Sequence, residues 1–146
     1  MSNEPQLGGV VRVRRIRERD SRTGLTTALT EERRAAARVT RIEELLATMP
    51  EPSVEDPASF AARHHAAAAL GEALTRARAD LEAAHRITLA ARDRWRSDRT
   101  RLAAVESLVE RRAQVRRSDE RRRETKELDA VAEDLWRRNH REEATG

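Results

Sequence analysis

Histidine is the first residue type to consider for metal binding or proton transfer, and the chain has four. His64 and His65 are adjacent, so on a helix their side chains point about 100° apart. Two helical ligands of one metal ion need a spacing of four residues instead. His85 and His140 each lie alone among charged residues. We therefore expect all four histidines to be exposed or lightly packed, and we expect no metal site.

Other patterns that support catalysis or cofactor binding are also missing. There is no cysteine, which excludes disulfides, thiolate nucleophiles and zinc–thiolate sites. The five glycines are scattered and form no phosphate-binding loop. The carboxylates lie beside arginines, which favours solvated ion pairs over an acid with a raised pKa. The sequence thus predicts a protein that is not an enzyme and that needs no cofactor or small-molecule ligand.

Arginine dominates the segment 110–126 and could contact phosphates or carboxylates. The arginines of this segment are Arg111, Arg112, Arg116, Arg117, Arg121, Arg122 and Arg123. Acidic residues are interleaved with them, and on a helix the cations would surround the axis, which weakens binding driven by counterion release. We interpret the segment first as a solvated coiled-coil flank. Binding to DNA or RNA and docking onto an acidic protein surface are the alternatives.

The composition indicates which elements must position these residues. Of the 146 residues, 38% are charged and 2% aromatic, with 29 arginines and 25 alanines. Alanine, arginine, glutamate and leucine are strong helix formers, and this profile is typical of a coiled coil or long helix. So few aromatic residues exclude a β-sandwich or a doubly wound sheet. With no apolar run of about 18 residues and no signal-peptide pattern, we expect a cytoplasmic protein.

Proline and glycine divide the chain into segments. Three prolines crowd the segment 49–57, whereas residues 72–145 contain neither proline nor glycine. Because proline interrupts helices, the first segment is a bend and the second can be one continuous helix. We expect a flexible N-terminal tail at 1–9, a first helix at 10–49, a bend at 50–57, a second helix at 58–140 and a flexible C-terminal tail at 141–146.

Both predicted helices carry apolar residues at alternating steps of three and four. On the first helix they are Ala28, Ala35, Val39, Ile42, Leu46 and Met49, with Glu32 as a polar member. On the second they are Leu70, Leu74, Ala77, Leu81, Ala84, Thr88, Ala91, Trp95, Asp98, Leu102, Val105 and Val109. A seven-residue repeat sustained over this length is typical of a coiled-coil seam. The fold class predicted is therefore all-α, a long antiparallel two-helix coiled-coil hairpin.

The register of the second seam changes after Val109. Leu128, Val131 and Leu135 form a new apolar stripe two positions out of phase. This stripe and Trp136 have no obvious partner within the chain, unless the segment 7–16 lies alongside. Trp95, in contrast, belongs to the main seam. We expect Trp95 to pack between the helices and Trp136 to be a candidate contact for a binding partner.

Several stretches resemble the family of the flagellar export protein FliJ, a small coiled-coil component of the type III export apparatus. The likeness near the C-terminus includes a Lys-x-Leu-Asp stretch, in which Ala130 stands where an acidic residue is common. At the start it includes a Val-rich and Arg-rich opening helix. The stretches are residues 10–18, Arg94-Trp95-Arg96, Arg101-Leu102, residues 105–111 and residues 124–129. The resemblance extends over nearly the whole chain in architecture.

The resemblance implies a coiled coil similar to the stalk subunit of rotary ATPases. Its chain ends would insert into the ring of the flagellar export ATPase FliI and stimulate it, and the region near the bend would contact the export gate protein FlhA. A role in handling export chaperones, and peripheral association with the inner face of the cell membrane at the flagellar base, are also implied. The ATPase-binding residues would be Arg12, Arg15, Ile16, Arg123, Lys126, Leu128, Asp129, Leu135 and Trp136, and the gate-binding residues Leu46, Met49, Leu70 and Ala73.

Two other functions compete with this interpretation. One is a structural coiled coil that dimerises as a scaffold, and the other is a basic helical protein that binds nucleic acid. We favour the interpretation that the protein is a monomeric hairpin and does not bind nucleic acid. A stalk protein of a virulence-type secretion system is a close variant that the sequence does not separate from the flagellar one.

Overall fold

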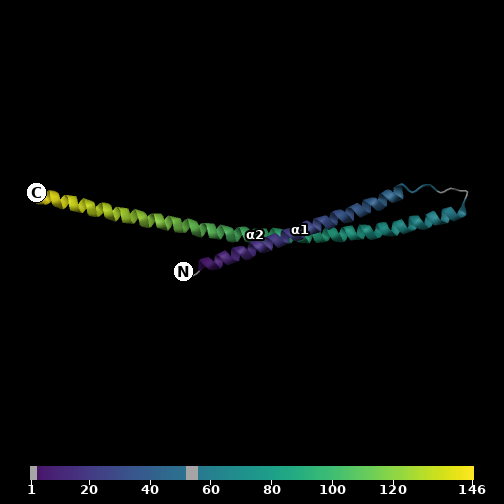
Figure 1. The fold of residues 1–146 in the computed structure, drawn as a ribbon, viewed down its shortest axis with the longest axis horizontal. Helices are drawn as coiled ribbons and strands as arrows, with labels where there is room; N and C mark the ends of the chain where they lie inside the picture. Colours follow the sequence, from purple (N-terminus) through teal and green to yellow (C-terminus); the bar gives the residue numbers. More distant parts are fainter. Residues whose placement is uncertain (1–2, 52–55) are drawn as a thin grey trace. The chain divides into compact units, whose positions relative to one another are not determined.

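The chain forms two long α-helices, α1 (Asn3–Ala47) and α2 (Pro57–Thr145), of 45 and 89 residues (Figure 1). This computed structural model describes residues 3–51 and 56–146. The all-α prediction is confirmed, and so is the hairpin, because α1 and α2 pack against each other. None of the helices in these ranges is both long and apolar enough to cross a membrane.

The junction between the helices follows local backbone chemistry. At the end of α1, Thr48 and Met49 donate their N–H groups to the carbonyls of Glu44 and Leu46. The N-cap of α2 is Asp56, whose carboxylate accepts hydrogen bonds from the Ala58 N–H at 3.0 Å and from the Ser59 hydroxyl at 2.7 Å. Pro57 stands at the first helical position, where its missing N–H costs nothing.

The helix ends differ from the predicted ones by a few residues. α1 begins at Asn3 instead of Val10 and ends at Ala47 instead of Met49. α2 begins at Pro57 and continues to Thr145, past the predicted end at His140. Parts of the predicted N-terminal tail, residues 1–2, and of the predicted bend, residues 52–55, lie outside the described residues. The flexibility expected of the two tails stays a prediction.

The chain divides into two units, of which the first is Arg12–Leu102. We call it the hairpin segment. Within it, the residues that lose most solvent contact follow steps of three and four on both helices. On α1 they are Arg14, Glu18, Ser21, Leu25, Ala28, Glu32, Ala35, Val39, Ile42 and Leu46; on α2 they are Arg63, Ala67, Leu70, Leu74, Ala77, Leu81, Ala84, Thr88, Ala91, Trp95, Asp98 and Leu102. The predicted seams are therefore present, and both begin earlier in the sequence than predicted, at Arg14 on α1 and at Arg63 on α2. The α2 seam stops short of Val109.

Polar residues occupy several seam positions. The buried residues of the hairpin segment are Ala28, Val39 and Ala77 together with Glu18, Ser21, Thr88 and Asp98. The seam of α1 was recognised only from Ala28 onward because the preceding positions are mostly polar. A coiled-coil interface accepts a polar residue at a loss of stability, and such residues specify register.

The second unit combines the start of α1, up to Val11, with Ala103–Gly146. We call Ala103–Gly146 the C-terminal segment. Its only half-buried residues are Val105, Ala113 and Ser118, and every residue from 119 to 146 is exposed. Val109, assigned to the seam from the sequence, is also exposed. The C-terminal segment is thus a helix without a buried stripe.

Candidate functional site

Charged side chains connect the two helices along the outer edges of the seam in the hairpin segment. Arg78 on α2 pairs with Glu43 on α1, with 2.8 Å between Nη2 and Oε1. Arg38 on α1 approaches Asp80 on α2 at 3.6 Å. Both pairs are largely exposed, so each stabilises the fold by no more than about 1 kcal/mol. Their main effect is to favour one register and the antiparallel direction.

His85 makes a third connection between the helices. Its Nδ1 lies 2.7 Å from Oε1 of Glu32, and this hydrogen bond is the main reason that the pKa of Glu32 is lowered. The side chain of His85 is exposed, as expected. Its partner Glu32 is 53 positions away in the sequence, so this pairing could not be predicted from local spacing.

Glu18 is the centre of the most connected polar cluster. Glu18 is buried, at 6% exposed. Its carboxylate accepts hydrogen bonds from Nε and Nη2 of Arg22 and, at 2.9 Å, from the indole Nε1 of Trp95. The Arg22 hydrogen bonds, followed by the Trp95 bond, lower the pKa of Glu18. Arg99 lies over the Trp95 ring at 5.3 Å. Trp95 therefore packs between the helices as predicted, and its N–H is satisfied.

The residues proposed for gate binding lie near the ends of the helices that flank the bend. Leu46 and Leu70 occupy seam positions on α1 and α2, and both are half-buried. Met49 follows the end of α1 and is also half-buried, as is Ala73 beside the seam of α2. All four belong to the hairpin segment, and two of them, Leu46 and Leu70, occupy seam positions.

The residues proposed for ATPase binding fall into two groups. Arg12, Arg15 and Ile16 lie on α1 in the hairpin segment, and all three are exposed. The other six lie on α2 in the C-terminal segment and are exposed as well: Arg123, Lys126, Leu128, Asp129, Leu135 and Trp136. The two groups belong to different units of the chain.

The apolar members of the second group form a stripe along one side of α2. Leu128, Val131, Leu135 and Trp136 are between 55% and 70% exposed. The spacing of three and four residues places Leu128, Val131 and Leu135 on one helix face, and Trp136 lies at the edge of that face. The Trp136 ring packs against His140 on the next turn, with 4.1 Å between ring centroids. We call these four residues the C-terminal stripe. Large apolar side chains left this exposed are typical of a protein-binding surface.

Features of other kinds of functional site do not appear in the described part of the chain. In residues 3–51 and 56–146, no group of three or more His, Asp or Glu side chains could hold a metal ion. Phe60 and His64 stack at 6.5 Å between ring centroids, on the outside of α2 near its start. The described surface therefore offers charged edges, grooves and apolar stripes, which are means of contacting other macromolecules.

These features define a class of protein, an antiparallel two-helix coiled coil whose longer helix carries an exposed apolar stripe. The chain belongs to the flagellar FliJ family, since the family model described as "Flagellar FliJ protein" matches residues 3–141. The resemblance found in the sequence is thereby confirmed. Membership makes the protein a non-enzymatic component of the flagellar export apparatus. Comparisons with curated proteins and with solved structures find no match.

Two polar features of the hairpin segment, a cluster of side chains and a groove, were not predicted from the sequence. One is the Glu18–Trp95 cluster, and the other is a groove around Asp98. Both lie at heptad positions that carry a polar residue. Extending the α1 seam toward the N-terminus in strict steps of three and four would have placed Glu18 in the interface.

Proposed function

We propose that this protein couples the flagellar export ATPase to the export gate. The C-terminal segment binds inside the ring of the ATPase FliI and promotes ring assembly and ATP hydrolysis. The region of the hairpin segment nearest the bend contacts the gate protein FlhA. The protein acts in the cytoplasm, peripherally associated with the membrane at the flagellar base, and also escorts export chaperones.

The observation that supports the ATPase contact is the C-terminal stripe. Four large apolar side chains remain more than half exposed on a helix segment in which residues 119–146 have no cover among the described residues. Burying such side chains against a partner gains about 25 cal/mol per Å² of apolar surface, and tryptophan is enriched among the residues that dominate binding energy. Arg123 and Lys126 lie within two turns of the stripe and can pair with carboxylates at its rim.

The mechanism that follows is allosteric. A single helix inside a ring of identical subunits makes different contacts with each subunit. Those contacts favour a different conformation in each subunit of the ring. The resulting shift in conformational equilibrium is a coupling free energy between the ATPase and the second partner, the export gate. The chain supplies no catalytic group in this scheme, so all hydrolysis occurs on the ATPase.

The gate contact is supported by position and partial exposure. Leu46, Met49, Leu70 and Ala73 lie around the bend, and each keeps part of its surface accessible. A gate protein would contact the accessible edges of these side chains while their other sides remain in the seam. Substitutions there will therefore affect folding and binding together, and alanine at Met49 is the mildest probe.

Mixing the protein with its cognate export ATPase tests the ATPase contact. The wild-type chain is expected to raise the hydrolysis rate and the fraction of ring-sized oligomers measured by light scattering. The triple variant Leu128→Ser, Leu135→Ser and Trp136→Ser should lose both effects. The matched control is Leu45→Ser, Phe60→Ser and Leu89→Ser, which removes three exposed apolar side chains outside the C-terminal segment. Equal loss in both triples, or no effect of the wild-type chain, would contradict the proposal.

A further inference from the structure

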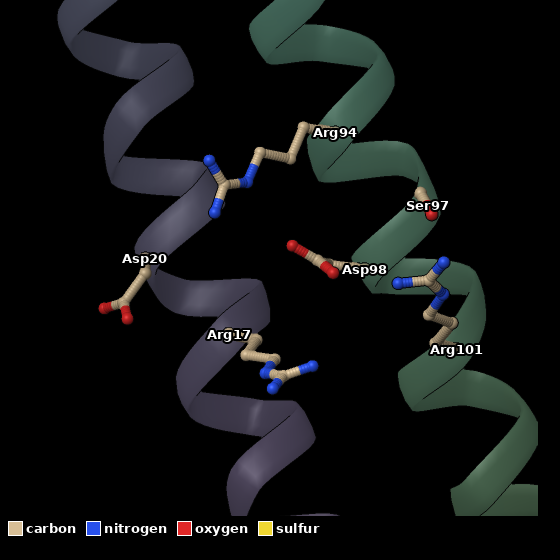
Figure 2. A pocket seen from close by; sticks show the side chains of 6 residues that line it. All are labelled: Arg17, Asp20, Arg94, Ser97, Asp98 and Arg101. Atoms are coloured by element: carbon tan, nitrogen blue, oxygen red, sulfur yellow. The ribbon is translucent and has the colours of Figure 1, made fainter.

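A groove of the hairpin segment gathers arginines around a buried carboxylate. Its cavity of about 380 Å³ is lined by Arg17 and Asp20 of α1 and by Arg94, Ser97, Asp98 and Arg101 of α2. Figure 2 shows the Asp98 carboxylate pointing into the space between the helices, with the Arg94 and Arg17 side chains reaching into the same space. Asp20 points away from it. The charges that face the groove are therefore three guanidinium groups and one carboxylate.

These groups have not paired with one another. Asp98 is only 9% exposed, and among the described residues its carboxylate has no hydrogen bond and no ion pair. The same holds, over residues 3–51 and 56–146, for the guanidinium groups of Arg17, Arg94 and Arg101. The Asp98 carboxylate is not among the fully buried atoms without a partner, so it keeps contact with water in the groove and remains able to accept hydrogen bonds from an incoming cation. The groove thus offers one acceptor and three forked donors to something outside the chain.

The groove continues into an apolar part along the same face. A second cavity of about 410 Å³ shares Asp20 and Arg94 with the first and is lined further by Ser21, Gly24, Ala28, Ile87, Ala90 and Ala91. The lining side chains are small except Ile87, which is 62% exposed. A side chain added at Gly24 would meet no atom within 4 Å. There is consequently room for apolar side chains to enter from outside.

On α2, the two parts of the groove follow one helical stripe. Ile87, Ala91, Arg94, Asp98 and Arg101 are spaced by four, three, four and three residues. Arg94 and Arg101 are two turns apart, about 10.5 Å along the axis, with Asp98 between them. A second helix laid alongside presents its own residues at the same intervals. Such a helix must therefore place apolar residues beside the apolar residues of the stripe, and residues of opposite charge beside Arg94, Asp98 and Arg101.

We propose that this groove binds an amphipathic helix of a partner protein. The partner helix carries five contact residues, which are two apolar residues followed by a Glu, a Lys and a second Glu. These five residues are separated by steps of four, three, four and three positions. The two glutamates pair with Arg94 and Arg101, where Arg17 adds donors from α1. The lysine pairs with Asp98, and the apolar side chains cover Ala91 and the space beside Gly24. The hairpin segment then becomes two strands of a three-helix coiled coil.

A partner helix explains features that other occupants do not. A nucleic acid would bring phosphates toward the unpaired carboxylate of Asp98 and would leave the apolar part uncovered. A helix of mixed charge satisfies the arginines and the carboxylate together, and arginine–carboxylate pairs are among the stronger polar contacts between proteins. This surface belongs to the hairpin segment and does not depend on the C-terminal stripe, so the inference goes beyond the proposed function.

The test uses the full chain and two synthetic helical peptides. One peptide carries Leu, Leu, Glu, Lys and Glu at the stated steps, and the other carries the same five residues in reversed order, so that both helix directions are tested. Fluorescence anisotropy is expected to show saturable binding of one of the two peptides. Binding should fall at least tenfold for Arg17→Glu, Arg94→Glu and Arg101→Glu combined. It should fall similarly for Gly24→Leu, which fills the apolar part. Asp98→Asn should weaken the lysine peptide several-fold but leave a peptide with Gln in place of Lys unchanged.

Matched variants separate the groove from general effects of charge and folding. The charge control is Arg33→Glu, Arg41→Glu and Arg96→Glu, three exposed arginines outside the groove. The glycine control is Gly71→Leu, where an added side chain also has open space. Both controls should bind like the wild type, and circular dichroism should report equal helicity for all variants.

Three results would overturn the proposal. The first is a lack of binding by both peptides, or binding reduced equally by the control variants. The second is a salt-sensitive duplex DNA complex that Arg17→Glu, Arg94→Glu and Arg101→Glu abolish, which would assign the groove to nucleic acid. The third is a concentration-dependent dimer, seen by light scattering, that Gly24→Leu dissolves, which would assign it to a second copy of this chain. None of these results involves the export ATPase, so they are independent of the proposed function.

Discussion

The helix α2 passes through two regions that carry apolar residues at the same spacing but have different surroundings. In the hairpin segment, its residues at steps of three and four are buried or half-buried against α1. In the C-terminal segment, Leu128, Val131 and Leu135 follow the same steps and are each more than half exposed. Equal spacing thus leads to burial in one region and exposure in the other. An apolar stripe identifies a surface that needs a partner, but it does not say whether that partner belongs to the same chain.

Ion pairs differ between the regions in the same way. Those of the hairpin segment include pairs between the helices, such as Arg78 with Glu43. Two ion pairs of residues 103–146, Arg117 with Glu110 and Arg137 with Glu133, join side chains of α2 itself. Pairs within one helix support helix formation by a few tenths of a kcal/mol and are lost in salt. The C-terminal segment is therefore held as a helix by local interactions, and its exposed face is free to be recognised.

The two tryptophans provide the largest expected contrast. Trp95→Ala removes a half-buried ring and the indole donor to Glu18, so the free energy of unfolding should fall by about 2 kcal/mol. Trp136→Ala removes an exposed ring and should change the stability by less than about 0.5 kcal/mol. Urea unfolding followed by circular dichroism measures both. Equal losses would mean that the C-terminal stripe is buried in solution.

Two threonines give a smaller contrast with the opposite sign. The fully buried Thr88 hydroxyl makes no hydrogen bond of normal geometry among the described residues, although it lies close enough to Glu32 to help lower the pKa of that carboxylate. Thr88→Val should therefore raise the free energy of unfolding by about 1 kcal/mol. The exposed Thr125 hydroxyl donates to the Arg121 carbonyl, and Thr125→Val should be neutral within about 0.5 kcal/mol. Urea unfolding followed by circular dichroism measures both free energies of unfolding. A loss of stability in Thr88→Val would show that this hydroxyl hydrogen-bonds the nearby Glu32.

Acidification should weaken the hairpin segment through Glu18 and Glu32. The pKa of each is lowered in the folded protein from an ordinary value of 4.5, by hydrogen bonds from Arg22 and from His85 respectively. Their contribution to stability is therefore complete above pH 4.5 and is lost as the pH falls through the lowered values. Thermal unfolding between pH 6 and pH 3 should show this loss. In the double variant Glu18→Gln and Glu32→Gln the dependence on pH should be shallower; an unchanged slope would assign it to other carboxylates.

Most of the fold and the C-terminal stripe could be predicted from the sequence, because both depend on local patterns. Pro50 and Pro57 located the bend, and the seam from Ala28 to Leu46 was recognised from its apolar residues. The exposure of Leu128 and Trp136 was expected from the change of register. The pairing of Glu18 with Trp95 could not be predicted, because it depends on how two distant stretches align.

The sequence by itself determined that this protein is helical, where its helices separate and which stripes are apolar. Helix propensity, proline geometry and heptad spacing act over a few residues, so they can be read along the chain. Only the tertiary structure decided which polar residues meet across the seam. The relative register of α1 and α2 places His85 beside Glu32 and gathers Arg17, Arg94 and Arg101 around Asp98. Such contacts depend on the sum of many weak side-chain pairings over the whole interface, and no single stretch of sequence contains that sum.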